Sequence, residues 1–335
     1  MSNKFKKVFI LLVIFSVLPI STAYARTFKI ATLSPDGTFW MKQMRVGAEE
    51  IKKQTEGRVK FKFYPGGVMG NDLNVLRKIR IGQLHGGAVT LGTVSLSTSD
   101  ASIYGLPFLF SNLDEAEKIR KTTDSILSKK IESDGFVNFG FAQGGFAYLM
   151  SKQKINNFDD LRKQKSWVPE KSDVGLSVYR SIDVTPISLP LSDVLTGLQT
   201  GLINTVITSP IGALALQWHT HIKYVVDLPI SYLVAVMVID KKVFKKISAS
   251  DQVIVRKVMT DVYNKIDSRN KTDNIAARKA LINQGIEFVK LDKVEKAEWI
   301  KVGNLVIDEL NSKHNYDKDL YKAMIINKER VSKLQ

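Results

Sequence analysis

The chain has 335 residues, no cysteine, and 49 lysines and arginines against 33 acidic residues, which gives a formal net charge of +16. Because 44% of its residues are hydrophobic, it can build one large or two medium folded domains. This composition excludes a disordered chain, a disulfide-stapled miniprotein and a cysteine-based zinc or iron–sulfur site. It also excludes a polytopic membrane protein, because the single long apolar run lies at the N-terminus.

Residues 1–25 have the three-part pattern of an export signal. Lysines at positions 4, 6 and 7 precede an apolar stretch over 8–18, and Ala23-Tyr24-Ala25 offers the small residues that a signal peptidase reads. The stretch is too short to cross about 30 Å of hydrocarbon as a stable anchor, so an uncleaved anchor is the weaker alternative. We expect cleavage after Ala25 and a periplasmic protein that begins at Arg26.

The first part of the mature chain alternates between strand and helix patterns. Strands are predicted over 28–33, 59–63 and 88–91, with helices over 38–55 and 71–82 between them. This order predicts a parallel sheet. Two helical patterns follow over 113–121 and 123–133, and two strand patterns over 136–141 and 147–151.

A second α/β series follows without a flexible linker. It comprises predicted strands over 166–168, 185–188 and 205–208, helices over 174–181 and 191–202, and a further strand over 234–239. From Ser248 onward the pattern is mostly helical. Two α/β units without a linker predict two lobes joined by more than one crossing strand. The crevice at the carboxyl ends of the strands is then the expected ligand site.

The sequence holds no recognisable catalytic constellation. It contains neither a G-x-S-x-G elbow nor an H-E-x-x-H motif. Of the four histidines, only His219 and His221 have metal-like spacing, and a surface turn beside Trp218 is the simpler interpretation. The basic residues are scattered and do not form a stripe with aromatics, which argues against nucleic-acid binding. We therefore expect no catalytic residue, no metal and no cofactor.

Several motifs, in their order and spacing, resemble one family over nearly the whole mature chain. They are FYPGGVMG at 63–70, GLPFLF at 105–110, NFDDLR at 157–162, WVPE at 167–170 and LSDVLTGLQTGLIN at 191–204. In these motifs the chain is similar to the solute-binding proteins of tripartite ATP-independent periplasmic (TRAP) transporters, of the dicarboxylate-binding type.

The resemblance implies a two-lobed periplasmic-binding-protein fold of the α/β class, with a hinge and a long helix spanning both lobes. Lobe I would comprise residues 26–148 and about 236–275, and lobe II residues 149–235 and about 276–335. The implied function is a monomeric receptor that closes on a small organic solute and delivers it to a permease with a small and a large membrane subunit. A receptor that feeds a sensor kinase, and less so a periplasmic enzyme, are the alternatives.

The chain departs from the family at the positions that bind the solute in relatives. Many relatives carry an arginine where this chain has Trp167, and acidic-sugar binders carry a second one where it has Ala147. A glutamate–asparagine pair before proline becomes Thr208-Ser209. A carboxylate held by arginine is therefore disfavoured, whereas a carboxylate bound otherwise, a sugar-like solute or a ring-bearing solute stays open.

The candidate ligand-binding residues follow from these substitutions and from the strand ends. Trp167 either stacks on the solute in the cleft, which we favour, or turns into the core of lobe II. Tyr148 is a weaker aromatic candidate. Asn71 and Asp72 either bind solute hydroxyls or only cap a helix. The remaining candidates are polar residues in loops that follow strands: Ser34, Thr90, Thr208 and Ser209.

Overall fold

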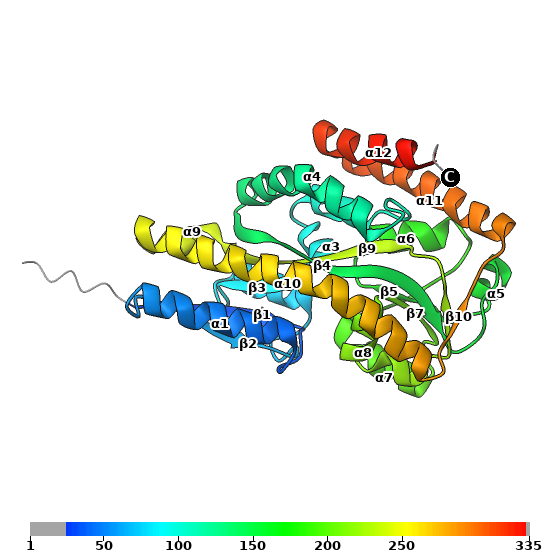
Figure 1. Cartoon of the computed structure of the whole chain (residues 1–335), viewed down its shortest axis with the longest axis horizontal. Coiled ribbons are helices and arrows are strands. Elements are labelled where there is room, and N and C mark those ends of the chain that lie inside the picture. The colour runs from blue at the N-terminus through cyan, green and yellow to red at the C-terminus, as the bar shows by residue number, and fades with distance from the viewer. Residues whose placement is uncertain (1–24, 333–335) are drawn as a thin grey trace, which may run out of the picture.

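The computed structural model describes residues 25–332, so the predicted export signal at 1–25 lies outside the described residues except for Ala25. A single mixed sheet runs through the molecule in the order β10-β8-β4-β9-β3-β1-β2, with β7 also paired to β4. A two-stranded sheet of β5 and β6 accompanies it. Helices cover both faces, which confirms the predicted α/β class (Figure 1).

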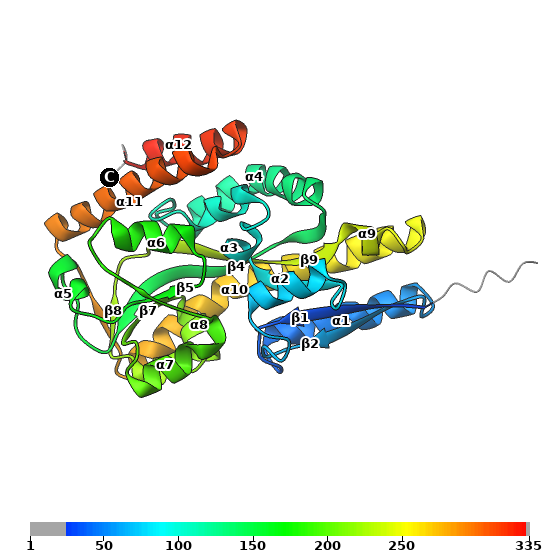
Figure 2. The same cartoon turned by 180° about the vertical axis from the view of Figure 1, so that it is seen from behind.

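The N-terminal half contains the parallel part of the sheet. Its elements are β1 (Arg26–Thr32), α1 (Phe39–Gln54), β2 (Val59–Tyr64), α2 (Asp72–Arg80), β3 (Gly86–Thr90), α3 (Leu91–Val94), the 3-10 helix η1 (Ser99–Gly105) and α4 (Leu113–Ser133). Met41, Met44, Ala48 and Ile51 form the buried stripe of α1. Helices α1 and α10 cover one face of this half, and α2 and α4 cover the other (Figures 1 and 2).

The second half is built on shorter strands. Its elements are α5 (Phe158–Arg162), β5 (Trp167–Pro169), α6 (Asp173–Arg180), β6 (Ile187–Leu189), η2 (Leu191–Asp193), α7 (Val194–Thr200), β7 (Thr205–Thr208), α8 (Pro210–Ala215), η3 (Trp218–His221), β8 (Tyr224–Val226) and β10 (Glu287–Val289). Strand β4 (Phe136–Ser151) pairs with β9 (Ser231–Asp240) up to Ala147 and with β7 from Tyr148 onward. We therefore propose to divide lobe I from lobe II at this point of β4, one residue before the predicted boundary after Tyr148.

Strands β4 and β9 and the 35-residue helix α10 (Ala249–Asn283), which follows the short helix α9 (Lys241–Phe244), join the lobes. At 1.5 Å per residue α10 is roughly 50 Å long, and Figure 1 shows it crossing the whole body. The long helix of the predicted fold is thereby confirmed.

Strand β4 replaces two predicted strands with one. Its pairing with β9 shifts register between Asn138 and Phe141 and again between Gln143 and Gly145. Gly140 and Gly145, both with positive φ, lie at these two bulges, so the chain bends without ending the strand. The glycines that interrupted the alternating pattern in the sequence mark bends rather than a break.

The C-terminal helices also differ from the sequence-based division. Helix α11 (Lys293–His314) packs on α6 of lobe II, whereas α12 (Lys318–Ser332) packs on α4 of lobe I. The sequence assigned this whole region to lobe II. The contacts of α12 favour lobe I instead, and a helical pattern indicates that one face of a helix is buried but not which lobe buries it.

The second bulge of β4 leads to a first prediction. A Cβ on Gly145 would lie 2.5 Å from Asn274 Nδ2, and φ is +84°, whereas Gly140 has φ of +96° with nothing within 4 Å of a Cβ. Gly140→Ala should cost about 1 kcal/mol of folding free energy, from backbone strain alone. Gly145→Ala should cost at least about 1 kcal/mol more, because Asn274 must also give up its hydrogen bonds. Urea unfolding followed by circular dichroism measures both; equal losses would contradict the role of Asn274.

Candidate functional site

Loops that follow parallel strands of the two lobes provide the candidate site. Strands β1, β2 and β3 are parallel and end at Thr32, Tyr64 and Thr90. Strands β5 and β7 are linked by a parallel bridge between Ser166 and Thr205 and end at Pro169 and Thr208. The carboxyl ends of parallel strands are where α/β proteins bind ligands.

Asp72 is the centre of a polar cluster in lobe I. Its Oδ2 accepts hydrogen bonds from Thr90 N at 3.1 Å, from Thr90 Oγ1 at 3.4 Å and from Thr93 Oγ1 at 3.3 Å. The residue is only 8% exposed, and this burial raises the pKa of its carboxyl to about 6. The three hydrogen bonds lower the pKa, but burial has the larger effect. No lysine or arginine in the described part of the chain pairs with it.

Asn71 links the two lobes. Its Oδ1 accepts the hydrogen bond of Asn74 N at 2.9 Å and so caps α2, as the sequence allowed. Its Nδ2 donates at 2.9 Å to Oε2 of Glu170, which follows β5 in lobe II. One side chain therefore both orders a helix start and bridges from lobe I to lobe II.

The remaining loop residues lie at the strand ends as expected, but with local partners. Ser34 is half-buried, with its Oγ 3.0 Å from Thr38 Oγ1, and its carbonyl accepts Gly66 N at 3.0 Å. Ser209 is 2% exposed and caps α8 through Gly212 N, and Thr208 is 6% exposed beside it. These contacts fix the loops, and whether the side chains also touch a solute stays a prediction.

Trp167 lies in the core of lobe II. It is 2% exposed and meets Trp218 edge-on with ring centroids 5.3 Å apart. Its Nε1 donates to the carbonyl of Leu189 at 2.9 Å, so the one polar atom of the indole is already used. Of the two interpretations that the sequence left open, this placement favours the core over the favoured stacking role. Strand β5 pairs with β6, which brings the Leu189 carbonyl within reach of the indole.

Tyr148 is paired in register with Thr208, the last residue of β7. Its half-buried ring lies beside the guanidinium of Arg278, 5.9 Å from the ring centroid, and beside Phe288, with ring centroids 6.5 Å apart. Burial raises the pKa of its hydroxyl. The structure thus brings together Asp72 and Thr90, with Asn71 next to them in the chain, whereas Trp167 lies in the core of lobe II.

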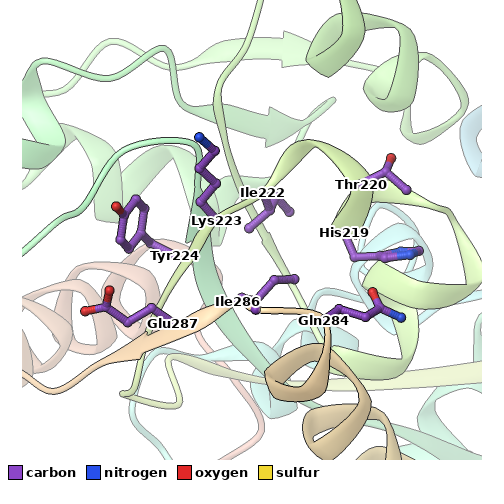
Figure 3. A pocket seen from close by; sticks show the side chains of 9 residues that line it. His219, Thr220, Ile222, Lys223, Tyr224, Gln284, Ile286 and Glu287 are labelled. Carbon is purple, nitrogen blue, oxygen red and sulfur yellow. The ribbon is translucent and has the colours of Figure 1, made fainter.

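A surface hollow of about 590 Å³ lies elsewhere, at the amino ends of β8 and β10 (Figure 3). His219 and Glu287 are among its lining residues, and His219 Nδ1 lies 3.1 Å from the carbonyl of Ala213. Because β4 pairs with β8 at Ser151 and with β7 at Tyr148, the hollow is at the opposite end of the sheet from Thr208. It is therefore not part of the candidate site.

Sequence reasoning did not select Glu170 or Thr93 as candidate ligand-binding residues. Glu170 follows a strand just as Ser209 does, and this position was the available signal. Thr93 lies one helical turn after Thr90, where both hydroxyls reach one carboxylate. Within residues 25–332 no group of three metal-ligating side chains occurs, and none of the helices there could span a bilayer.

Comparisons with known proteins agree with the predicted family. The family model of bacterial extracellular solute-binding protein, family 7 (DctP) matches residues 30–314. A C4-dicarboxylate-binding periplasmic protein DctP of Rhodobacter capsulatus is 23% identical, over 78% of this chain and 79% of its own length.

Solved structures agree on the fold. A TRAP periplasmic solute-binding protein of Xanthobacter autotrophicus with bound β-D-galacturonate is 21% identical, with a TM-score of 0.82. Another, of Haemophilus influenzae with bound L-gulonate, is 19% identical with a TM-score of 0.83. Each comparison covers 90% of this chain and 99% of the other. With the model match spanning most of the chain, the protein belongs to the bacterial extracellular solute-binding proteins of family 7, the DctP family.

Proposed function

We propose that this protein is the periplasmic receptor of a TRAP transporter, which closes its two lobes on a small solute and releases it unchanged to the permease. The observation that carries the proposal is the hydrogen bond between Asn71 and Glu170, which joins loops of the two lobes at the strand ends. In a receptor that works by lobe closure, such contacts form only when the lobes approach.

Membership of an extracellular family supports a periplasmic location. The export signal, with cleavage after Ala25, would place the mature chain there. The small and large membrane subunits of the permease would then be its protein partners, and the receptor would act as a monomer. Transport would draw on an ion gradient, because the periplasm supplies no ATP.

The charges at the strand ends define the solute class that we propose. Relatives are described with bound sugar acids, galacturonate and gulonate, but neither Trp167 nor Ala147 offers a guanidinium to an acid group. Asp72 and Glu170 instead contribute two carboxyl groups, and among the described residues neither has an ion-pair partner. An anion would be repelled by them, whereas hydroxyls can donate to carboxylates. A hydroxylated solute without negative charge fits best.

A matched thermal-shift comparison tests this. Galactose should raise the melting temperature and galacturonate should not; the polyol that corresponds to gulonate and gulonate itself form a second pair. When the free solute concentration is about a hundred times Kd, a solute that binds only the native state adds about 2.7 kcal/mol to the free energy of unfolding. This should raise the melting temperature by roughly 5 °C. Stabilisation by the acids alone would contradict the proposed solute class but not the receptor function.

The placement of Trp167 gives a second test of the site. Trp167→Ala should lower the folding free energy by about 3 to 5 kcal/mol, because it empties a packed core position. Trp167→Phe should lower the folding free energy by less. It should leave unchanged the affinity for a solute identified in the thermal-shift comparison. Chemical unfolding and calorimetry measure the two effects. A tenfold loss of affinity in Trp167→Phe with unchanged stability would restore the stacking role.

The raised pKa of Asp72 predicts a pH dependence of stability. Because the folded-state pKa is about 6 and the usual value is 3.8, the folded protein binds the proton more tightly than the unfolded chain does. The contribution of Asp72 to folding free energy is therefore greatest below pH 4 and is lost as the pH rises through 6. Asp72→Asn should be more stable than wild type by about 2 kcal/mol at pH 7.5 and nearly equal at pH 4.

Urea unfolding at several pH values measures this difference, with the exposed Asp308→Asn as a control of the same chemistry. A stability difference between Asp72→Asn and wild type that does not change between pH 4 and 7.5 would contradict the buried-carboxyl interpretation.

A further inference from the structure

The hairpin of α11 and α12 runs along one edge of the molecule and touches both lobes. Figures 1 and 2 both show it beside α6 and α4, away from the strands β1 and β2. Near its start, α11 is anchored in lobe II, where Trp299 is 4% exposed and stacks on Phe158 with ring centroids 4.8 Å apart. The far end of α11 and α12 pack with lobe I.

The C-terminal end of α11 makes polar contacts with α6 of lobe II. Glu309 Oε1 accepts hydrogen bonds from Ser177 Oγ and from Arg180 Nη1, both at 3.0 Å. Lys313 Nζ lies 2.9 Å from Asp173 Oδ2, and His314 Nε2 lies 3.1 Å from the same oxygen. Three residues of α11 and three of α6 are thus paired across one helix–helix contact.

The next residues of the chain make polar contacts with lobe I. Tyr316 Oη lies 2.8 Å from Ser102 Oγ, and Asp317 N donates to Asp100 Oδ1 at 2.8 Å. Lys130 Nζ on α4 joins Asp317 Oδ2 at 3.0 Å and Asp100 Oδ2 at 3.4 Å. Within residues 309–317 the chain therefore passes from contacts with lobe II to contacts with lobe I.

This bridge is separate from β4, β9 and α10, which also cross between the lobes. Helix α6 begins at Asp173, three residues after Glu170, which holds the Asn71 amide of lobe I. Any movement that withdraws the Glu170 loop from Asn71 carries the start of α6 with it. The hairpin cannot follow both lobes, so one of its two sets of contacts must break.

The polar contacts of α11 with α6 are more exposed than the contacts of the hairpin with lobe I. The side chains of Arg180, Lys313 and Asp173 are 68%, 53% and 41% exposed, and exposed pairs contribute little in water. On the lobe I side, Ser102 is 6% and Tyr316 3% exposed. Leu310, Leu320 and Met324 add apolar burial there, in the same cluster as Leu127 and Ile131 of α4.

We propose that the α11–α12 hairpin is a strap that holds α6 against lobe I and limits how far the lobes separate when no solute is bound. This proposal rests on lobe closure being the working motion of the protein. On opening, the contacts of Glu309, Lys313 and His314 with α6 break, while Trp299 stays with lobe II and α12 stays with lobe I.

The test measures lobe separation directly and needs no solute. The chain has no cysteine, so Val46→Cys on α1 and Leu202→Cys after α7, both at exposed positions, accept two spin labels at defined places. Pulsed electron–electron double resonance then gives the distribution of distances between the lobes. The variant Glu309→Gln/Lys313→Gln removes the strap's charges that face α6.

A matched control is Glu298→Gln/Lys301→Gln, which removes the same two charges from α11 at an exposed pair 3.9 Å apart. Loss of two exposed pairs should raise the population with separated lobes roughly fivefold in the strap variant, and leave the control like wild type.

Unchanged distance distributions in both variants would overturn the strap proposal. Equal widening of the distance distribution in both variants would also overturn it, because the effect would then not depend on the contacts with α6. Circular dichroism melts of both variants show that each is folded. Failure of every solute to stabilise the protein would count against the proposed receptor function and leave the distance measurement intact, so the two failures are distinguishable.

Discussion

The structure depends on how the backbone N–H and C=O groups at the second bulge of β4 find hydrogen-bond partners. Where β4 shifts register against β9, its backbone groups lose regular partners, and a stripe of α10 supplies replacements. Asp267 accepts from Gln143 N at 2.7 Å, Asn270 donates to Gln143 O at 2.6 Å, and Asn274 donates to Gly144 O at 3.1 Å. Their spacing of i, i+3 and i+7 places all three on one face of the helix.

Arg120 connects this stripe to lobe I. Its Nη1 donates to Asp267 Oδ1 at 2.8 Å, its Nη2 to the carbonyl of Phe141 at 3.0 Å, and it pairs with Asp124 on its own helix. The guanidinium is 5% exposed, so its charge is acceptable only because carboxylates surround it. The bend between the lobes is thus defined by polar groups that are costly to leave unpaired, and the position of each lobe follows from that bend.

The α/β fold could be predicted from the sequence because the hydrophobic periodicity of strands and helices, the glycines and the ends of strands are local signals. It reached the polar cluster of lobe I for the same reason: Asn71, Asp72 and Thr90 follow or precede elements that the pattern identifies. It could not place Trp167, because a tryptophan in a short strand gives the same sequence pattern whether its side chain faces a cleft or a core. The deciding factors, Trp218 and the carbonyl of Leu189, are contacts between distant segments.

The oxygen and the nitrogen of the Asn71 side-chain amide have different partners, and this affects the chemistry of the position. The oxygen must face Asn74 N to cap α2, which obliges the nitrogen to face Glu170, so the orientation of the amide is fixed by the helix rather than by the other lobe. Hydrolysis of that amide to a carboxylate would keep the cap but set two negative oxygens against each other. A single spontaneous deamidation would thereby turn an attraction between the lobes into a repulsion, and old protein would differ from new in how readily it shuts.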